Sequence, residues 1–303
     1  MYSYTCAVVQ SSPVFFDKQK TMEKIGDLIR EAAKSKARVI LFPEVFIPGY
    51  PRGLSFGTVV GGRTPAGREL FLRYWENAIE VPGPESTQLA KYAQAANAFL
   101  AIGVTERDAV SDSLYCTLLY FSPQGKLLGK HRKIKPTAAE RILWGEGDGS
   151  DLIVYDTPQG KIGGLICWEN YMPLARTALY QQGIEVYLAP TADCRDTWQS
   201  SLIHIACEGR CYVLGCNQWV TKSAYPESLQ EEIKGQPDLL CNGGSVILSP
   251  LGKILAGPLF EGEGILYAEI DHREIIKSKM DFDVIGHYAR PDIFQFKVKK
   301  NEP

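Results

Sequence analysis

Short apolar runs alternate with longer amphipathic segments along the whole chain, and this alternation restricts the possible folds more than any other feature. The runs are rich in Val, Ile, Leu and Tyr and are bounded by Gly, Pro or charged residues, which is typical of β-strands. They lie at 4–10, 37–43, 98–106, 114–122, 161–169, 185–190, 211–219, 244–250 and 264–270. Helices are expected at 17–35, 68–79, 84–98, 172–183, 197–209 and 271–280. The pattern predicts a layered α/β domain.

The length of the chain allows one large domain or two fused halves. Its 303 residues, 45% hydrophobic and 22% charged, have the composition of a globular protein and exclude disordered or coiled-coil classes. We expect a single domain over 1–303 that ends in a short basic C-terminal tail at about 292–303.

Charge and apolar run length argue against binding to nucleic acid or membrane. The net charge is −2, so no overall field attracts anions. The runs at 37–43 and 244–250 are far shorter than the roughly 20 residues of a membrane span. The N-terminus lacks the basic and apolar regions of a signal peptide, and none of the eight cysteines forms a CxxC pair. These observations predict free thiols and a cytoplasmic location.

Cys167 lies in the segment GGLICWENY, between an expected strand and an expected helix. Nucleophiles often occupy such a strand-to-helix turn, where backbone N–H groups stabilise a thiolate or an oxyanion. The alternative is a buried, unreactive cysteine like the other seven.

Glu44 lies in LFPEVFIPGYP, directly after a strand that should be buried. Burial raises the pKa of a carboxyl group, which suits a general base. The alternative is a solvated glutamate in a loop.

A basic stretch at 129–135 contains Lys130, His131, Arg132, Lys133 and Lys135. Three interpretations are open: a solvated stretch, a nucleic-acid patch, or a source of one lysine that stabilises a developing oxyanion.

Together these segments resemble the nitrilase (carbon–nitrogen hydrolase) superfamily. FPE, HRKIKPT and CWENYMPLAR occur in the order Glu, Lys, Cys, and the resemblance extends from residue 7 to residue 295. CWEN, GYPRG at 49–53 and GHYARPD at 286–292 are similar to the true nitrilase branch, including arylacetonitrilase-like members. The resemblance implies a four-layer αββα sandwich. It also implies a homodimer that forms through the helices after Cys167 and builds higher homo-oligomers or spirals.

The resemblance assigns roles to four residues. Glu44 corresponds to the general base, Lys133 to the catalytic lysine, Cys167 to the nucleophile and Glu140 to a second glutamate that positions substrate and lysine. The implied reaction is hydrolysis of a nitrile to the acid and ammonia, by water, through a Cys167 thioimidate and thioester. No metal or organic cofactor has a role in this scheme.

Residues beside these motifs are expected to line the substrate pocket. Core or interface packing is the alternative for the two tryptophans in this set, and aromatic, arylaliphatic and aliphatic nitriles all remain open. The set comprises Tyr50, Thr137, Trp168, Asn170, Pro190, Thr191, Ala192 and Trp198.

Four other functions compete with this hypothesis. An amidase or amide-forming acyltransferase would use the same Glu-Lys-Cys triad, whereas papain-like chemistry would pair Cys167 with His204. His204, Cys207 and Cys211 have a spacing that could bind zinc or form one packed helix face. A binding protein without enzymatic activity would instead contact nucleic acid through KHRKIK.

Overall fold

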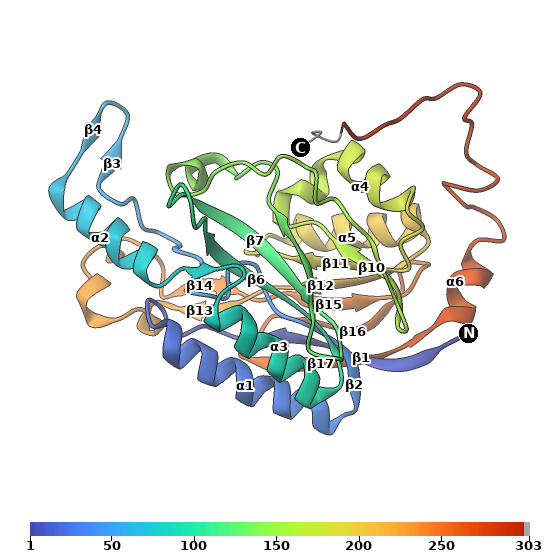
Figure 1. Cartoon of the computed structure of the whole chain (residues 1–303), viewed down its shortest axis with the longest axis horizontal. Helices are drawn as coiled ribbons and strands as arrows, with labels where there is room; N and C mark the ends of the chain where they lie inside the picture. Colours follow the sequence, from blue (N-terminus) through green and yellow to red (C-terminus); the bar gives the residue numbers. More distant parts are fainter. Residues whose placement is uncertain (300–303) are drawn as a thin grey trace.

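Two β-sheets form the centre of the computed structural model, which describes residues 1–299 (Figure 1). The strands of the first sheet follow the order β17-β1-β2-β6-β7-β8, with β5 (Ile79–Glu80) beside β6. Their bounds are β17 Gly264–Asp271, β1 Ser3–Gln10, β2 Ala37–Leu41, β6 Phe99–Arg107, β7 Leu114–Phe121 and β8 Leu127–Arg132. In the second sheet the order is β16 Ile254–Leu259, β15 Ser245–Leu248, β12 Tyr212–Cys216, β11 Val186–Pro190, β10 Gly160–Gly164 and β9 Tyr155–Thr157.

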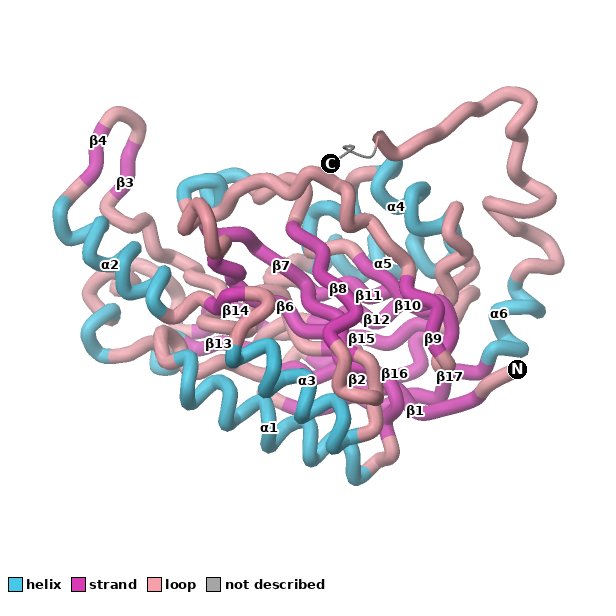
Figure 2. Tube along the Cα trace, in the orientation of Figure 1, coloured by secondary structure: helices cyan, strands magenta, loops and turns pink. Residues whose placement is uncertain are grey.

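Helices cover the outer face of each sheet. Helices α1 (Lys18–Lys34) and α3 (Pro84–Ala96) bury apolar side chains with the first sheet, and α4 (Pro173–Tyr180) and α5 (Asp196–Gly209) do so with the second. Between the sheets a third cluster includes Val8 of β1, Leu118 of β7 and Leu188 of β11. Figure 2 shows the helices on opposite sides of the strands. This arrangement confirms the expected αββα sandwich.

Local sequence explains how the first helix forms. The side chain of Asp17 accepts a hydrogen bond from the Lys20 N–H at 2.9 Å, which caps the helix start. Ile25 and Ile29 are one turn apart and face the sheet, where both are buried. The three- and four-residue spacing seen in the sequence is therefore the contact face of α1.

Two expected strands are shorter than predicted. The run at 161–169 ends at Gly164, and Cys167 begins a short 3-10 helix, η2 (Cys167–Tyr171). The run at 211–219 ends at Cys216, and Trp219 begins β13 (Trp219–Thr221), which pairs with β14 (Leu239–Asn242). Apolar composition continues through both turns, so it did not reveal where the strands end.

The remaining elements lie around this sandwich. A hairpin of β3 (Thr58–Val59) and β4 (Gly62–Arg63) projects beside α2 (Pro65–Glu76) in Figure 1. Short 3-10 helices occur at η1 (Ala138–Ile142), η3 (Lys222–Ala224) and η4 (Glu227–Leu229). Within residues 1–299, no helix is long and apolar enough to span a membrane.

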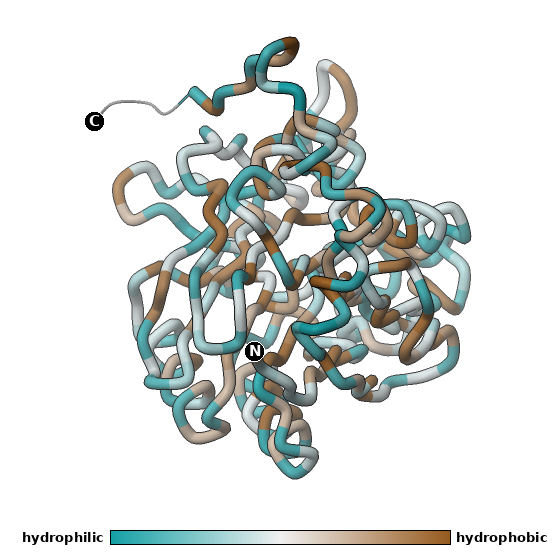
Figure 3. The backbone as a smooth tube through the Cα atoms, turned by 90° about the vertical axis from the view of Figure 1, so that its right-hand side faces the viewer, coloured by the Kyte–Doolittle hydropathy of each residue, from teal (hydrophilic) through white to brown (hydrophobic). Residues whose placement is uncertain are grey.

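The chain leaves the sandwich after α6 (His272–Ser278). Figure 3 shows this last segment running along the outside of the molecule, with hydrophobic and hydrophilic positions intermixed. Ile293 and Phe294 are among its exposed apolar side chains. The expected tail begins in this segment, and its final residues, 300–303, lie outside the described part.

Candidate active site

The candidate site lies where the ends of strands from both sheets meet. Glu44 follows β2 and Lys133 follows β8 of the first sheet, whereas Cys167 follows β10 and Thr191 follows β11 of the second. The sequence motifs point to Glu44, Lys133 and Cys167 as candidates for chemistry, and the fold brings these three residues together from positions far apart in sequence.

Lys133 forms ion pairs with two glutamates inside the protein. Its Nζ lies 2.6 Å from Glu44 Oε1 and 2.8 Å from Glu140 Oε2. Lys133 and Glu44 are fully buried, and Glu140 is nearly so. A buried charge is costly unless it is paired, so each member of this cluster depends on the others.

Burial and pairing set the protonation of this cluster. Burial raises the pKa of Glu44, and the nearby Lys133 charge opposes that effect. Burial by itself would lower the pKa of Lys133, but the charge of Glu44 and its other neighbours raise it well above the usual value. Lys133 is therefore a fixed cation beside a carboxylate that binds a proton more readily than an exposed one.

One oxygen of Glu44 is available to a proton donor. Oε1 accepts from Lys133 and, at 3.5 Å, from the Cys116 thiol, whereas Oε2 has no hydrogen-bond partner among residues 1–299. The Cys167 thiol acts on the same carboxyl group and lowers its pKa. Glu44 thus has both a free lone pair and a neighbouring thiol proton.

Cys167 occupies a strained turn. Its φ of 51° lies in the left-handed region, which non-glycine residues rarely adopt and which is frequent at functional sites. The thiol accepts a hydrogen bond from Thr191 Oγ1 at 3.1 Å. Burial, followed by the charge of Glu44, raises the pKa of the thiol to about 12. Cys167 is therefore a neutral thiol at rest, and it needs a base when it reacts.

Two expected pocket residues hold Glu140 in place. The Tyr50 hydroxyl donates to Glu140 Oε1 at 2.8 Å, and the Thr137 N–H donates to Glu140 Oε2 at 2.6 Å. Tyr50, Glu140 and Trp144 also line a cavity of about 70 Å³. Because Glu140 pairs with Lys133, this hollow borders the cluster of Glu44, Lys133 and Glu140.

Asn170 and Trp198 have packing roles in this structure. Asn170 Nδ2 donates to the carbonyls of Leu165 and Cys167, and its Oδ1 accepts from the Tyr187 hydroxyl at 2.7 Å. These bonds stabilise the Cys167 turn and leave the amide no free atom. Trp198 lies on α5 and is buried in the core between this helix and the second sheet, as the packing alternative expects.

The other expected pocket residues lie on the loops beside Cys167. Trp168 is 39% exposed and donates from Nε1 to Asp193 at 2.8 Å. Pro190 ends β11 and leads into Thr191 and Ala192, both buried. The carbonyl of Ala192 accepts a hydrogen bond from Arg52, a residue that sequence reasoning did not select although it lies in GYPRG.

The basic stretch is paired with carboxylates rather than free. Lys130 and Arg132 form ion pairs with buried Glu106 on the neighbouring part of the sheet, and Lys135 pairs with Glu146. Lys130, His131 and Arg132 belong to β8 and are half-buried or buried, so the interpretation as a solvated stretch does not describe them. This pairing removes the row of free cations that nucleic acid would require.

The residues of the other two alternatives lie apart from this site. His204 is largely exposed on α5, where its Nε2 is 3.6 Å from Glu208. Cys167 instead accepts a hydrogen bond from Thr191 and lies near enough to Glu44 to lower the pKa of its carboxyl group. Cys211 is buried in the core of the second sheet, and the described residues contain no group of three or more ligands arranged to hold a metal ion.

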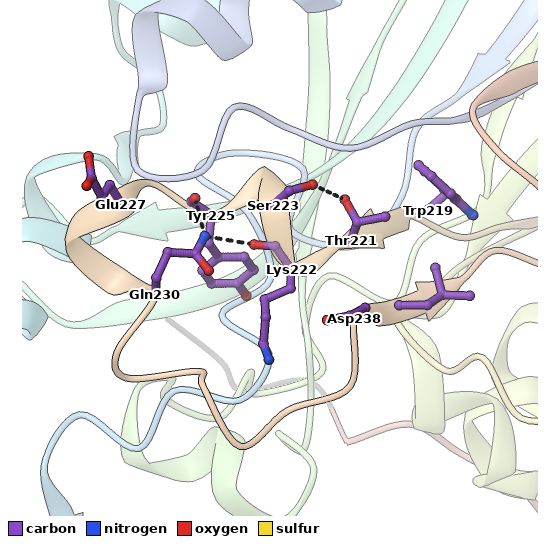
Figure 4. A pocket seen from close by; sticks show the side chains of 9 residues that line it. Trp219, Thr221, Lys222, Ser223, Tyr225, Glu227, Gln230 and Asp238 are labelled. Atoms are coloured by element: carbon purple, nitrogen blue, oxygen red, sulfur yellow. Dashed lines mark hydrogen bonds between the residues drawn. The ribbon is translucent and has the colours of Figure 1, made fainter.

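A hollow of about 850 Å³ is separate from this cluster. Figure 4 shows its lining around Trp219, Tyr225 and Asp238, from β13 to β14. None of Glu44, Lys133 and Cys167 lines it. The volume of a hollow therefore does not point to the candidate site. Buried titratable side chains and a strained backbone do.

Comparison with known proteins assigns the family. The model of the carbon-nitrogen hydrolase family matches residues 5–279. The chain belongs to the carbon-nitrogen hydrolase family. It is 53% identical over 297 residues to a bifunctional nitrilase/nitrile hydratase of Nicotiana tabacum, covering 96% of this chain and 85% of that protein. It is 52% identical over 299 residues to an aliphatic nitrilase of Sinorhizobium fredii, covering 98% and 96%. This carbon-nitrogen hydrolase is thus of the nitrilase branch.

Solved structures share the fold of this carbon-nitrogen hydrolase. Saccharomyces cerevisiae Nit3, of branch 10 of the nitrilase superfamily, has a TM-score of 0.74 at 23% identity, covering 94% of this chain and 96% of that one. A carbon-nitrogen hydrolase from Helicobacter pylori has a TM-score of 0.76 at 19% identity, covering 96% and 97%. At this identity the likeness concerns the four-layer architecture.

Proposed function

We propose that this carbon-nitrogen hydrolase converts an organic nitrile to the carboxylic acid and ammonia, with Cys167 as nucleophile. The observation that carries the proposal is the buried cluster in which the Cys167 thiol, the Glu44 carboxylate and the Lys133 ammonium converge. Relatives about half identical over nearly the whole chain, which are named as nitrilases, support the choice of substrate class.

The first step is addition of the thiol across the carbon–nitrogen triple bond. Because burial keeps the thiol protonated, Glu44 accepts its proton as sulfur attacks the nitrile carbon, and that proton then passes to nitrogen. The product is a covalent thioimidate. Lys133 remains charged and stabilises the negative charge that develops on the substrate.

Two waters complete the reaction. Glu44 activates the first, which adds to the thioimidate and gives a tetrahedral intermediate that carries hydroxyl, amino and thioether groups. Loss of ammonia leaves a thioester, and a second water activated by Glu44 releases the acid and restores the thiol. Each step reuses the same carboxylate, whose pKa is raised by burial and therefore suits proton transfer in both directions.

Glu140 has a supporting role in this proposal. It holds the Lys133 ammonium together with Glu44, and Tyr50 and Thr137 hold Glu140 in turn. Thr191 donates to the sulfur, and with Trp168 and Ala192 on the adjoining loops it would provide the walls against which substrate binds.

A matched pair of substrates tests the reaction class. Purified protein is incubated with a nitrile and with the amide of the same side chain, and ammonia, acid and amide are quantified. The proposal expects faster ammonia release from the nitrile. Preferential turnover of the amide would identify an amidase that uses the same three residues.

Four single variants test the assignment of residues. Cys167→Ala, Glu44→Gln and Lys133→Ala are each expected to lower kcat by roughly 10³-fold or more, because residues that act as one unit lose activity together. His204→Ala is the control and is expected to retain activity. Loss of activity in both Cys167→Ala and His204→Ala, with activity retained in Glu44→Gln and Lys133→Ala, would instead favour the papain-like alternative.

We further propose that the chain works as a homo-oligomer in a reducing compartment such as the cytoplasm. Exposed apolar side chains on η2 and α4, including Leu174, support pairing through the helices that follow Cys167. The eight cysteines are free thiols, which supports a reducing environment.

A further inference from the structure

The carboxylate of Glu169, in the CWEN segment, bridges the two halves of the site. Its Oε1 accepts from the Ile134 N–H at 2.6 Å, and its Oε2 accepts from the Ile166 N–H at 2.7 Å. Ile134 directly follows Lys133, and Ile166 directly precedes Cys167. One buried side chain thus connects the segment after β8 to the segment after β10.

A buried histidine holds this carboxylate. His131 Nε2 lies 3.0 Å from Glu169 Oε2, and His131 Nδ1 lies 2.8 Å from Asp151 Oδ1. Asp151 also accepts from the Arg132 N–H at 2.8 Å. Burial opposes a charge on His131, but Glu169 and Asp151 together raise the pKa of its imidazole to about 10. The imidazolium therefore neutralises the acidic groups on both sides at neutral pH.

The hydrogen bonds that Glu169 accepts are strong enough to hold the backbone at Ile134 and Ile166 in place. Hydrogen bonds from N–H groups to a charged acceptor are shorter and about twice as strong as those between neutral groups. In a buried setting, loss of the acceptor leaves two N–H groups without a partner. Since the two segments come from different sheets, Glu169 is a direct polar link between the backbones beside Lys133 and Cys167.

We propose that Glu169 and His131 are positioning residues that fix the Lys133 ammonium relative to the Cys167 sulfur and thereby direct the intermediate toward acid rather than amide. This inference rests on the proposed nitrile hydrolysis. Neither side chain is required to touch the substrate, because both act through Ile134 and Ile166.

The ratio of amide to acid reports on the placement of Lys133 relative to Cys167, because the tetrahedral intermediate can break down in two ways. Cleavage of its carbon–nitrogen bond, with a proton delivered to nitrogen, releases ammonia and leaves the thioester that becomes acid. Cleavage of its carbon–sulfur bond returns the Cys167 thiol and releases the amide. Both routes start from the same atoms, so the product ratio depends on where charge and proton lie relative to nitrogen and sulfur.

The experiment measures the amide-to-acid ratio of the full-length protein with one nitrile substrate. Glu169→Gln keeps the size of the side chain but replaces one acceptor oxygen with an NH₂ group. This NH₂ group would face a backbone N–H, and two donors cannot form a hydrogen bond. We expect the ratio to rise at least fivefold and kcat to fall by up to about a hundredfold, the scale of a 1 Å misplacement. His131→Asn is expected to shift both quantities in the same direction.

The product ratio separates positioning from folding. Because it is a property of each active molecule, it does not change when part of a sample is unfolded. Asp151→Asn offers a milder variant, since Asp151 is partly exposed and acts only through His131 and the Arg132 N–H. Glu31→Gln and His204→Asn, which alter exposed side chains, are the matched controls and are expected to keep the wild-type ratio.

The possible outcomes distinguish this inference from the proposed function. An unchanged ratio in Glu169→Gln, His131→Asn and Asp151→Asn would overturn the positioning role, even if kcat fell with the folded fraction. A raised ratio in these variants, with unchanged controls, would support it. Absence of nitrile turnover by the wild-type protein, by contrast, would refute the proposed function itself.

Discussion

The chemistry of a single thiol depends on the hydroxyl beside it. Thr191 Oγ1 donates to the Cys167 sulfur at 3.1 Å, and it accepts from the Asp193 N–H at 2.9 Å. Because the N–H occupies a lone pair of the oxygen, the hydroxyl hydrogen is directed at sulfur. This bond lowers the pKa of Cys167 against the larger effect of burial.

Replacement of Thr191 by valine is expected to make the thiol less reactive. Without the hydroxyl the pKa of Cys167 rises, so alkylation by iodoacetamide at pH 8 should slow by about five- to tenfold, the effect of one hydrogen bond. The rate is followed by mass spectrometry of the peptide that contains Cys167. Thr87→Val, on the surface of α3, is the control, and an unchanged alkylation rate in Thr191→Val would contradict the role given to the hydroxyl.

The residues proposed to react stand out in the sequence, whereas the residues that hold them in place do not. Glu44, Lys133 and Cys167 stand out because their residue types and short motifs point to chemistry. Glu169 and His131 gave no such signal, although both lie within quoted motifs. Their contact joins positions 38 residues apart through side-chain atoms, and neither periodicity nor composition encodes such a pairing.

At the level of elements, one glycine brings Glu44 close to its sheet. Gly103 lies in β6, and its N–H donates to the Pro43 carbonyl at 3.1 Å. A Cβ at this position would lie 2.4 Å from that carbonyl oxygen and 2.6 Å from the Glu44 Cα. Close approach of two backbones therefore requires a residue without a side chain.

Replacement of Gly103 by alanine is expected to displace Glu44. The added methyl group pushes the segment after β2 away from β6, so kcat should fall by about a hundredfold, while stability falls by only ~1–3 kcal/mol. Turnover per folded molecule and the urea unfolding midpoint measure the two effects. Gly235→Ala, where no atom lies within 4 Å of the added group, is the matched control. Full activity in folded Gly103→Ala would contradict this account.

The strands and helices were largely predictable, with one informative exception. Apolar runs identified the strands that are buried on both faces, such as β6 and β11. The sequence predicts no strand over 127–132, and a solvated stretch is one of the interpretations that it leaves open for these basic residues. In β8 the charges of Lys130 and Arg132 are neutralised by Glu106, and that of His131 by Glu169 and Asp151, so burial is compensated by partners that lie elsewhere in sequence.

The stability that His131 contributes through its contact with Glu169, which links β8 to η2, is expected to depend on pH. Folding raises the pKa of His131 from about 6.5 to about 10, so its contribution to stability is complete below pH 6.5 and is lost as pH rises through 10. His131→Asn should therefore be less stable than wild type by ~3–5 kcal/mol at pH 6, with a smaller difference at pH 10.5. Chemical denaturation at both pH values gives the comparison. A difference that grows with pH would contradict a charged histidine.

For the whole molecule, the double sheet explains why the site can be both dry and adjustable. Glu44 and Lys133 follow strands of the first sheet, and Cys167 and Thr191 follow strands of the second, so these groups meet at the boundary of the two layers. The apolar cluster between the sheets holds these layers together. Small changes in how one sheet packs on the other would move Lys133 relative to Cys167, which gives the Glu169 bridge its importance.

The outer surface of the second helical layer is expected to be covered by another copy of the chain. Tyr171, Met172 and Leu174 follow Cys167 directly, and Leu174 is 66% exposed. An apolar side chain in such a place is stabilised when a partner removes it from water. Because Cys167 begins the same segment, assembly and activity should be coupled.

Replacement of Leu174 by glutamate tests this coupling. A charge buried without a partner opposes association, so the mass measured by light scattering should fall toward that of the monomer at micromolar concentration. Nitrile turnover should fall with it, because the turn that carries Cys167 loses its support on the outer side. Val110→Glu introduces the same charge on an exposed loop between β6 and β7 and should change neither quantity. If Leu174→Glu kept the wild-type mass, the α4 face would not be the contact; if it dissociated with full activity, the site would be complete within one chain.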